Sequence, residues 1–227
     1  MNAIEFHNAI ATDFHNRYEV SKAFQERFEV WTRLFERYVA PTNRVMDMGC
    51  GSGVFSNYLA GKGCIVTGID GSEAMINLCN QAKTVPTAQF VKQLLPLDNA
   101  DSYQKQDVII ASSVLEYLND MSAMLQQAQS LLKPGGLVMV SMPNKRSIYR
   151  RIERLAFQLT GYPRYFAHIR NVSSETLLSQ QLHKLGFETL GVVYFSSGDP
   201  LSKSLKNVLP DYYVNSLFVG VYRKLKR

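Results

Sequence analysis

Apolar and polar residues follow two different rhythms along the chain. In its first part, the large apolar side chains that recur at intervals of three and four, with charged residues between them, are Phe24, Phe28, Trp31, Leu34, Phe35 and Tyr38. This spacing predicts a helix with one apolar face, and Pro41 ends the pattern. We therefore expect residues 1–40 to form a helical cover.

From residue 44 onward, short apolar runs alternate with helical stretches. The expected strands are RVMDMG, CIVTGID, QFVKQ, DVIIASS, LVMVSMP, FETLGVVYF and LFVGVYRKL. Runs that are almost continuously apolar indicate strands covered on both faces, as in a parallel sheet flanked by helices. The alternation breaks only within residues 144–171, which we interpret as an insertion. The pattern thus predicts an α/β domain over residues 41–227 that carries this insertion.

Composition narrows the class of protein. Of 227 residues, 46% are hydrophobic and 19% are charged, which excludes a disordered chain and a coiled coil. No apolar run approaches the roughly 18 residues of a membrane-spanning helix, and the first residues lack the features of a signal peptide. The three cysteines are expected to be free thiols in a reducing cytoplasm.

The net charge of +6 is unevenly distributed. Residues 1–140 hold 11 Lys and Arg against 14 Asp and Glu, whereas residues 141–227 hold 14 against 5. The excess of positive charge therefore belongs to the last two-fifths of the chain. It is compatible with nucleic acid, a membrane surface or an anionic small molecule.

A glycine-rich loop follows the first expected strand. Its sequence from Asp47 is DMGCGSG, and Asp70 ends the second expected strand, 17 residues after Gly53. Glycines at a strand-to-helix turn allow a sharp reversal and the close approach of a ligand to the backbone. A carboxylate at the end of the second strand can accept hydrogen bonds from both ribose hydroxyls of a nucleoside. Together these features predict a nucleoside cofactor.

The spacing and charge of the loop favour a cofactor without phosphate. A dinucleotide site prefers a third glycine three positions after the second, and Val54 occupies that position. The charge of Asp47 disfavours a pyrophosphate and favours a cation. S-adenosylmethionine carries a sulfonium and an ammonium and no phosphate, so we predict this cofactor rather than NAD.

These motifs resemble those of the class I S-adenosylmethionine-dependent methyltransferases. The resembling segments are VMDMGCGSG (45–53), GID (68–70), IIASSVLEYL (109–118) and LLKPGGLVMVSMPN (131–144). The resemblance implies a Rossmann-like, doubly wound, seven-stranded sheet, mostly parallel with an antiparallel last strand. It also implies that S-adenosylmethionine is the methyl donor and S-adenosylhomocysteine the product.

The same resemblance assigns the cofactor-binding positions. Those implied to line the methionine part are Asp47, Gly49, Gly51, Gly53 and Ser112, and Asp70 is implied to bind the ribose. Those implied to lie beside the adenosine are Gly71, Ser72, Met75, Gln93 and Leu94, although Met75 at its helical spacing could equally be a core residue. In the helical cover, Tyr18 together with Arg27 or Arg33 could bind the methionine carboxylate. The alternative is that these arginines face solvent.

Within this family the chain most resembles the ubiquinone-biosynthesis O-methyltransferases. The segments that carry this likeness are SVLEYL, LLKPGGLVMVSMPN, HIRNVSSETL with GFETL, and a final hairpin with Tyr194 and Tyr213. That family pairs two acids and a histidine after the fourth strand, where they can hold a divalent cation. This chain keeps only Glu116, with Ser113 and Tyr117 at the other two positions. The departure predicts no metal and argues against the quinone-precursor substrate.

Candidate residues on the substrate side are Glu116, Tyr117, Asn144, His168 and Arg170. Methyl transfer mainly requires that nucleophile and methyl group be held in line. A general base is needed only when the nucleophile arrives protonated, as a phenol or an alcohol does. Among the four histidines, His168 is the candidate base, because it lies in the insertion; a role in lining the cavity without proton transfer is the alternative.

The insertion has one apolar face and one basic face. Its apolar stripe consists of Ile148, Ile152, Leu155, Ala156 and Leu159, and its basic residues are Lys145, Arg146, Arg150, Arg151 and Arg154. Such a helix could be a lid that buries the stripe over the active site, or it could lie on an anionic membrane. We favour the lid, and nucleic acid is the least favoured partner, because the glycine-loop half is acidic and there is no recognised RNA-binding appendage.

The sequence therefore predicts a cytoplasmic, metal-independent methyltransferase that modifies a small molecule, by preference an oxygen of a hydroxylated aromatic or lipophilic metabolite. Association with a membrane through the insertion is an additional expectation, and the oligomeric state is open. One alternative is methylation of a carboxylate or of a substrate bound to an acidic carrier protein. Another is a non-catalytic cofactor-binding protein that uses the fold for interaction.

Overall fold

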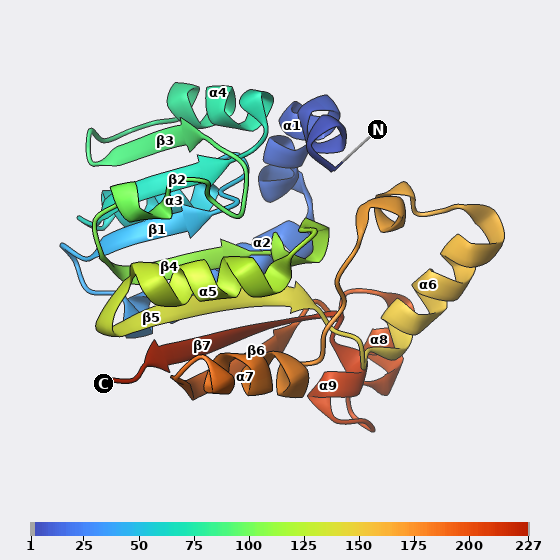
Figure 1. Ribbon diagram of the computed structural model, residues 1–227. Coiled ribbons are helices and arrows are strands. Elements are labelled where there is room, and N and C mark those ends of the chain that lie inside the picture. Colours follow the sequence, from blue (N-terminus) through green and yellow to red (C-terminus); the bar gives the residue numbers. More distant parts are fainter. Residues whose placement is uncertain (1–2, 227) are drawn as a thin grey trace.

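The computed structural model describes residues 3–226 and shows a central sheet between two layers of helices (Figure 1). The strands are β1 Arg44–Met48, β2 Ile65–Asp70, β3 Ala88–Lys92, β4 Gln106–Ser112, β5 Leu132–Pro143, β6 Phe187–Phe195 and β7 Leu217–Lys224. The helices are α1 Ala3–Val20, α2 Lys22–Tyr38, α3 Val54–Gly61, α4 Glu73–Gln81, α5 Met121–Leu131, α6 Ile148–Thr160, α7 Glu175–Lys184, α8 Pro200–Leu205 and α9 Asp211–Val214. Every strand predicted from an apolar run is present.

The strands lie in the order β3-β2-β1-β4-β5-β7-β6. Each neighbouring pair from β3 to β5 is parallel, and β7 runs antiparallel to both β5 and β6. The order reverses between β1 and β4, and in such sheets ligands bind beyond the carboxyl ends of the strands at this point. The predicted mostly parallel, seven-stranded sheet with an antiparallel last strand is confirmed.

The two faces of the sheet bury different helices because side chains of a strand alternate between faces. In β1, Met46 and Met48 belong to the core beneath α5 and α7, whereas Val45 belongs to the core beneath α2 and α3. The apolar stripe of α2 explains its placement: Trp31 is fully buried, and its ring lies 5.3 Å from that of Phe55 in α3. The predicted helical cover is therefore two helices, with α2 anchored on the sheet layer and α1 extending over α4.

The insertion forms α6 and a short turn of 3-10 helix, Arg164–His168. Figure 1 shows α6 at the edge of the molecule toward which β4 and β5 run, next to α8 and α9. Its predicted apolar stripe is largely exposed: Ile152, Leu155 and Leu159 are 51%, 57% and 77% exposed. The prediction of a lid that buries the stripe is thus wrong for these three residues, because α6 turns them away from the protein. Only Ile148 and Ala156 are partly covered.

Two further sequence predictions concern the molecule as a whole. Cys50, Cys64 and Cys79 are free thiols, as expected. Within residues 3–226, none of the helices has the length and hydrophobicity that crossing a bilayer requires.

The packing of α2 on α3 generates a stability prediction. Replacing Trp31, which is fully buried, with alanine should lower the free energy of unfolding by about 3–5 kcal/mol, because it removes a large apolar side chain and leaves a cavity. The neighbouring substitution Arg33→Ala is the control and should change it by less than about 0.5 kcal/mol. Urea denaturation followed by circular dichroism measures both, and equal effects of the two substitutions would show that α2 is not anchored by this ring.

Candidate functional site

The loop between β1 and α3 is shaped by glycines that no other residue can replace without strain. Gly49 and Gly53 have φ values of +77° and +75°, in the left-handed region. A Cβ atom at Gly49 would overlap Val114, and one at Gly53 would lie 2.8 Å from the Sγ of Cys79. Gly51 is different, since the nearest neighbour of its Cβ would be Phe14 of α1, at 3.5 Å. The open side of the loop therefore faces α1.

Asp47, one residue before the end of β1, is a buried carboxyl group with one oxygen to which no described residue bonds. The Oγ of Ser56 donates a hydrogen bond to its Oδ2 at 2.7 Å, while Oδ1 is buried and has no hydrogen-bond partner among residues 3–226. Burial raises the pKa of this carboxyl to about 7, although the hydrogen bond from Ser56 opposes the shift. An unpartnered buried carboxylate oxygen is suited to a cation or to a hydrogen-bond donor of a ligand.

Asp70 links the glycine loop to the start of α4. Its carboxylate accepts hydrogen bonds from the backbone N–H of Gly51 at 2.9 Å and of Ser72 at 2.8 Å. Burial raises its pKa, and these backbone donors and the nearby His7 lower it. Each carboxylate oxygen retains a further lone pair, so the group can still accept bonds from a ribose diol. Asp70 therefore lies beside the glycine loop, as the sequence predicts. Its role in binding a nucleoside stays a prediction.

Arg27 brings a positive charge from α2 to the end of β4. Its Nη2 donates a hydrogen bond to the Oγ of Ser112 at 3.0 Å, and its Nε is buried without a partner among the described residues. Burial raises the pKa of Tyr18, and the charge of Arg27 lowers it, so the phenol and the guanidinium lie near each other. Tyr18, Arg27 and Ser112 thus form one polar group beside the glycine loop.

Arg33, predicted as a cofactor ligand, is not part of this group. It forms an exposed ion pair with Glu29 at 3.2 Å on the solvent side of α2. The helix period explains the difference: Arg27 precedes Trp31 by four positions and shares its buried stripe, whereas Arg33 falls between the buried positions. That period was visible in the sequence and would have selected Arg27.

Glu116 is a second buried carboxyl group, in the 3-10 turn Leu115–Tyr117 after β4. It is 3% exposed, and its Oε2 has no hydrogen-bond partner within the described part of the chain. Burial raises its pKa to about 7, against the opposing charges of Arg27 and Arg150. Its backbone carbonyl accepts hydrogen bonds from the N–H groups of Arg170 and Asn171, at 2.7 and 3.1 Å. The turn after β4 is thereby tied to the end of the insertion.

A cleft separates α1 from the loops after β2, β3 and β4. The residues that line it are Ala3, Ile4, Gly71, Leu94, Leu95, Tyr117, Leu118, Asn119 and Arg170. It therefore contains Gly71 and Leu94, predicted beside an adenosine, and Tyr117 and Arg170, predicted on the substrate side. The ring of Tyr117 packs edge-on against His7 of α1, with 5.0 Å between ring centroids. Burial raises the pKa of Tyr117, which keeps its hydroxyl protonated.

Three other residues predicted beside the adenosine have different surroundings. The side chain of Gln93 hydrogen-bonds with Asn99 and Tyr103. The Oγ of Ser72 caps α4 and donates to Asn8 at 2.6 Å. Met75 is completely buried, which agrees with the alternative of a core residue. The structure thus gives none of these side chains a free group toward the cleft.

Two residues predicted on the substrate side, Asn144 and His168, have different surroundings. Asn144 is 1% exposed, and its Nδ2 donates to the carbonyls of Tyr212 and Asn215 at 2.8 and 2.9 Å. Its amide therefore holds the loops after β5 and α9 together, while the residue also lines a pocket beside α6. Its contact with a substrate stays a prediction. His168 instead packs its ring against Phe6 of α1 at 4.8 Å, and so lies where the insertion meets α1.

No group of three or more His, Cys, Asp or Glu side chains within residues 3–226 is arranged to hold a metal ion. The sequence did not point to His7 or Asn8 as site residues, and it presented Arg150 only as a basic residue of the insertion. The structure places these three residues around the cleft or the buried carboxyls. His7 and Asn8 carry no motif, and only the packing of α1 brings them to the site.

Two solved structures have the same fold over almost the whole chain. N-methyltransferase NodS from Bradyrhizobium japonicum WM9, in complex with S-adenosyl-L-homocysteine, superposes with a TM-score of 0.72 and 19% identity, covering 99% of both chains. Magnesium protoporphyrin IX methyltransferase from Synechocystis PCC 6803, with bound S-adenosylhomocysteine, gives 0.70 and 21%, covering 97% of both chains. At these identities the likeness establishes the fold.

Sequence comparison adds a family and a relative that matches part of the chain. A family profile described as "Methyltransferase domain" matches residues 23–192. Ubiquinone biosynthesis O-methyltransferase of Glaesserella parasuis serovar 5 (strain SH0165) is 35% identical over 114 residues, which are 45% of this chain and 46% of that protein. The match thus spans about half the length of this curated relative.

The burial of Asp47 generates a pH-dependent stability prediction. Its pKa of about 7 in the folded protein exceeds the roughly 3.9 of an unfolded chain, so the folded state binds more protons between these values. The stability of the wild type therefore falls as pH rises toward 7. The substitution Asp47→Asn removes the charge, and its stabilising effect should grow between pH 5 and pH 8 by about 1–3 kcal/mol.

Thermal unfolding of the ligand-free protein at the two pH values measures this effect, which corresponds to a shift in Tm of several degrees. Asp101→Asn is the matched control, since Asp101 is exposed. A gain that is the same at pH 5 and pH 8 would show that Asp47 is not held protonated by burial.

Proposed function

The chain belongs to the methyltransferase-domain family, and on that premise we propose that it transfers the methyl group of S-adenosylmethionine to an oxygen atom of a hydroxylated aromatic or lipophilic small molecule. The methyl donor is supported by the polar groups around the glycine loop. The oxygen acceptor is supported above all by one observation, the buried carboxyl of Glu116 with its free Oε2.

The residues around the glycine loop fit the charges of S-adenosylmethionine. The free Oδ1 of Asp47 suits the ammonium, the unpartnered Nε of Arg27 suits the carboxylate, and Asp70 can accept the ribose hydroxyls. When bound, this cofactor supplies a methyl group on a positively charged sulfur. The chain's part is to hold that group in line with the acceptor and to exclude water.

Glu116 would accept the proton of the acceptor hydroxyl at Oε2. A general base is most effective when its pKa lies near the working pH, and burial places that of Glu116 at about 7. The positive charges of Arg27 and Arg150 favour the ionised carboxylate and would also favour an acceptor oxygen that develops negative charge. His168 is the alternative base, since it lies at the junction of the insertion and α1.

Two alternatives differ from this proposal in what they require. A carboxylate acceptor, free or on a carrier protein, arrives already ionised and needs no base, so a carboxyl poised at Glu116 would serve no purpose in proton transfer. A non-catalytic protein would bind S-adenosylmethionine without producing S-adenosylhomocysteine. Incubation with S-adenosylmethionine and matched panels of phenols, carboxylates and amines, followed by measurement of S-adenosylhomocysteine, separates the three.

A peripheral membrane contact through α6 remains part of the proposal. The exposed Ile152, Leu155 and Leu159 and the neighbouring arginines support it, since such a face can enter the interface of an anionic bilayer. Co-sedimentation with phosphatidylglycerol vesicles tests it. Replacing Leu155 and Leu159 with serine should abolish binding, and unchanged binding would contradict the contact.

The role of Asp70 can be tested by binding alone. Asp70→Ala should weaken binding of S-adenosylmethionine by about 100-fold, because it removes two ribose hydrogen bonds to a charged group and frees the loop from its backbone contacts. Isothermal titration calorimetry measures the affinity. Asp101→Ala is the control and should bind as the wild type does; if Asp70→Ala also does, the proposed ribose role is wrong.

The role of Glu116 can be tested by kinetics. Glu116→Gln should lower kcat for a phenolic acceptor by about 100-fold or more while leaving cofactor affinity within about twofold. In the wild type the rate should rise with pH through about 7, as the carboxyl ionises, and this rise should be absent from the variant. Glu188→Gln, on the exposed edge strand, is the control. A variant that keeps both rate and pH profile would exclude Glu116 as the base.

A further inference from the structure

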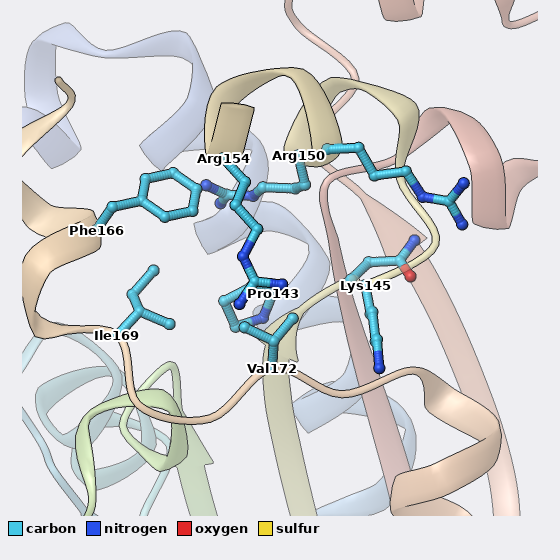
Figure 2. A pocket seen from close by; sticks show the side chains of 9 residues that line it. Pro143, Lys145, Arg150, Arg154, Phe166, Ile169 and Val172 are labelled. Atoms are coloured by element: carbon cyan, nitrogen blue, oxygen red, sulfur yellow. The ribbon is translucent and has the colours of Figure 1, made fainter. Parts of the chain in front are cut away.

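A basic pocket lies between α6 and the segment that leads from the insertion to α7 (Figure 2). It is lined by Pro143 at the end of β5 and by Asn144 and Lys145, which follow it, by α6 on one side, and by Phe166, Ile169 and Val172 on the other. Resting on the proposed function, we propose that this pocket binds an anionic group, a phosphate or a carboxylate, of an amphiphilic methyl acceptor. The site would thus select molecules that carry both a negative charge and an apolar part.

Three of the four cations that line the pocket have no acidic partner among residues 3–226, and the fourth, Arg150, is paired with Glu153. Lys145, Arg151 and Arg154 form no ion pair or side-chain hydrogen bond with any residue between positions 3 and 226. Other basic residues nearby are used by the protein: Arg146 lies over the ring of Tyr212 and Arg164 over that of Tyr162. Three unpaired cations therefore lie together at one pocket, where an anion would be attracted.

Arg150 gives the pocket a fixed cationic group. Its side chain is 18% exposed, and it donates hydrogen bonds to Glu153 at 2.9 Å, to the hydroxyl of Tyr165 at 2.5 Å and to the carbonyl of Ser216 at 3.3 Å. Glu153 balances this one charge. Arg150 is consequently a rigid part of the wall, whereas Arg151 and Arg154 remain free to engage a ligand.

The opposite wall is apolar. Figure 2 shows the guanidinium of Arg154 over Pro143, with Ile169 and Val172 beside it. Phe166 is held in place by stacking on Phe157 of α6, with 5.7 Å between ring centroids. A purely inorganic anion would leave this wall unused, and a neutral hydrocarbon would leave the cations unpaired. Both surfaces are used by a molecule that joins a hydrocarbon part to an anionic group.

The pocket adjoins the proposed site of chemistry. The charge of Arg150 reaches the carboxyl of Glu116, and the backbone of Arg170 and Asn171, next to Ile169, is bonded to the carbonyl of Glu116. In the proposed binding mode, the anionic end of one molecule lies among Lys145, Arg151 and Arg154, and its acceptor oxygen points toward Glu116. This arrangement would fix the orientation of the acceptor from a point away from the reacting atom.

Binding of n-octyl phosphate, compared with n-octanol, tests the pocket without requiring turnover. Isothermal titration calorimetry on the wild type should show tighter binding of the phosphate by about tenfold or more, and this preference should shrink as salt is raised. The double variant Lys145→Gln, Arg154→Gln should bind the phosphate about 10- to 100-fold less tightly. Arg37→Gln, an exposed arginine on α2, is the control and should leave binding within about twofold. Circular dichroism verifies that each variant is folded.

The possible outcomes distinguish this proposal from a role of the cations at a bilayer surface and from the proposed methyl transfer. Equal affinity for phosphate and octanol, or a double variant that binds as the wild type does, overturns it. Binding to phosphatidylglycerol vesicles without binding to monomeric octyl phosphate also overturns it, since the cations would then serve a bilayer surface. If octyl phosphate binds as expected but S-adenosylmethionine does not bind, the pocket stands and the proposed methyl transfer fails.

Discussion

The arrangement of the site depends on the hydrogen bonds that the carboxylate of Asp70 accepts from the backbone. It ends the second strand and accepts the backbone N–H groups of Gly51 and Ser72, and so fixes the glycine loop and the first turn of α4 relative to each other. The loop, in turn, has a shape that only glycine permits at Gly49 and Gly53. One acidic side chain thus sets the floor of the cleft, and α1 completes it from above through the contact of Asn8 with Ser72.

The site holds polar groups that a structure built for stability alone would avoid. Asp47 Oδ1, Arg27 Nε and Glu116 Oε2 are buried without hydrogen-bond partners among the described residues, and each such group costs about 1–3 kcal/mol. These atoms belong to two acidic side chains and one basic side chain, near the ends of β1 and β4. A ligand that carries both positive and negative charge would give them hydrogen-bond partners.

The parts of this picture that could be predicted are those that local sequence determines. Strand-forming runs, the turn at the glycines and the acid at position 70 depend on neighbouring residues, and all were placed correctly. Arg27 and Arg33 stayed alternatives because the buried stripe of α2 was not used to rank them. Asn144 and the exposed stripe of α6 depend on contacts with distant loops, which no local pattern specifies. His7 and Asn8 reach the site only because α1 packs over it, and the local sequence does not specify that packing.

The way α1 is attached has a consequence for the timing of the reaction cycle. This helix lies over the glycine loop and the cleft, yet Ala11 is its one buried residue within the described range Ala3–Val20. A helix held mainly by partly buried side chains detaches from its neighbours at lower free-energy cost than the core strands do. Entry and departure of a molecule beneath it can therefore proceed by local opening while the sheet stays intact. Opening of α1 is then a step of the reaction cycle in its own right, with a rate separate from that of the bond-making step.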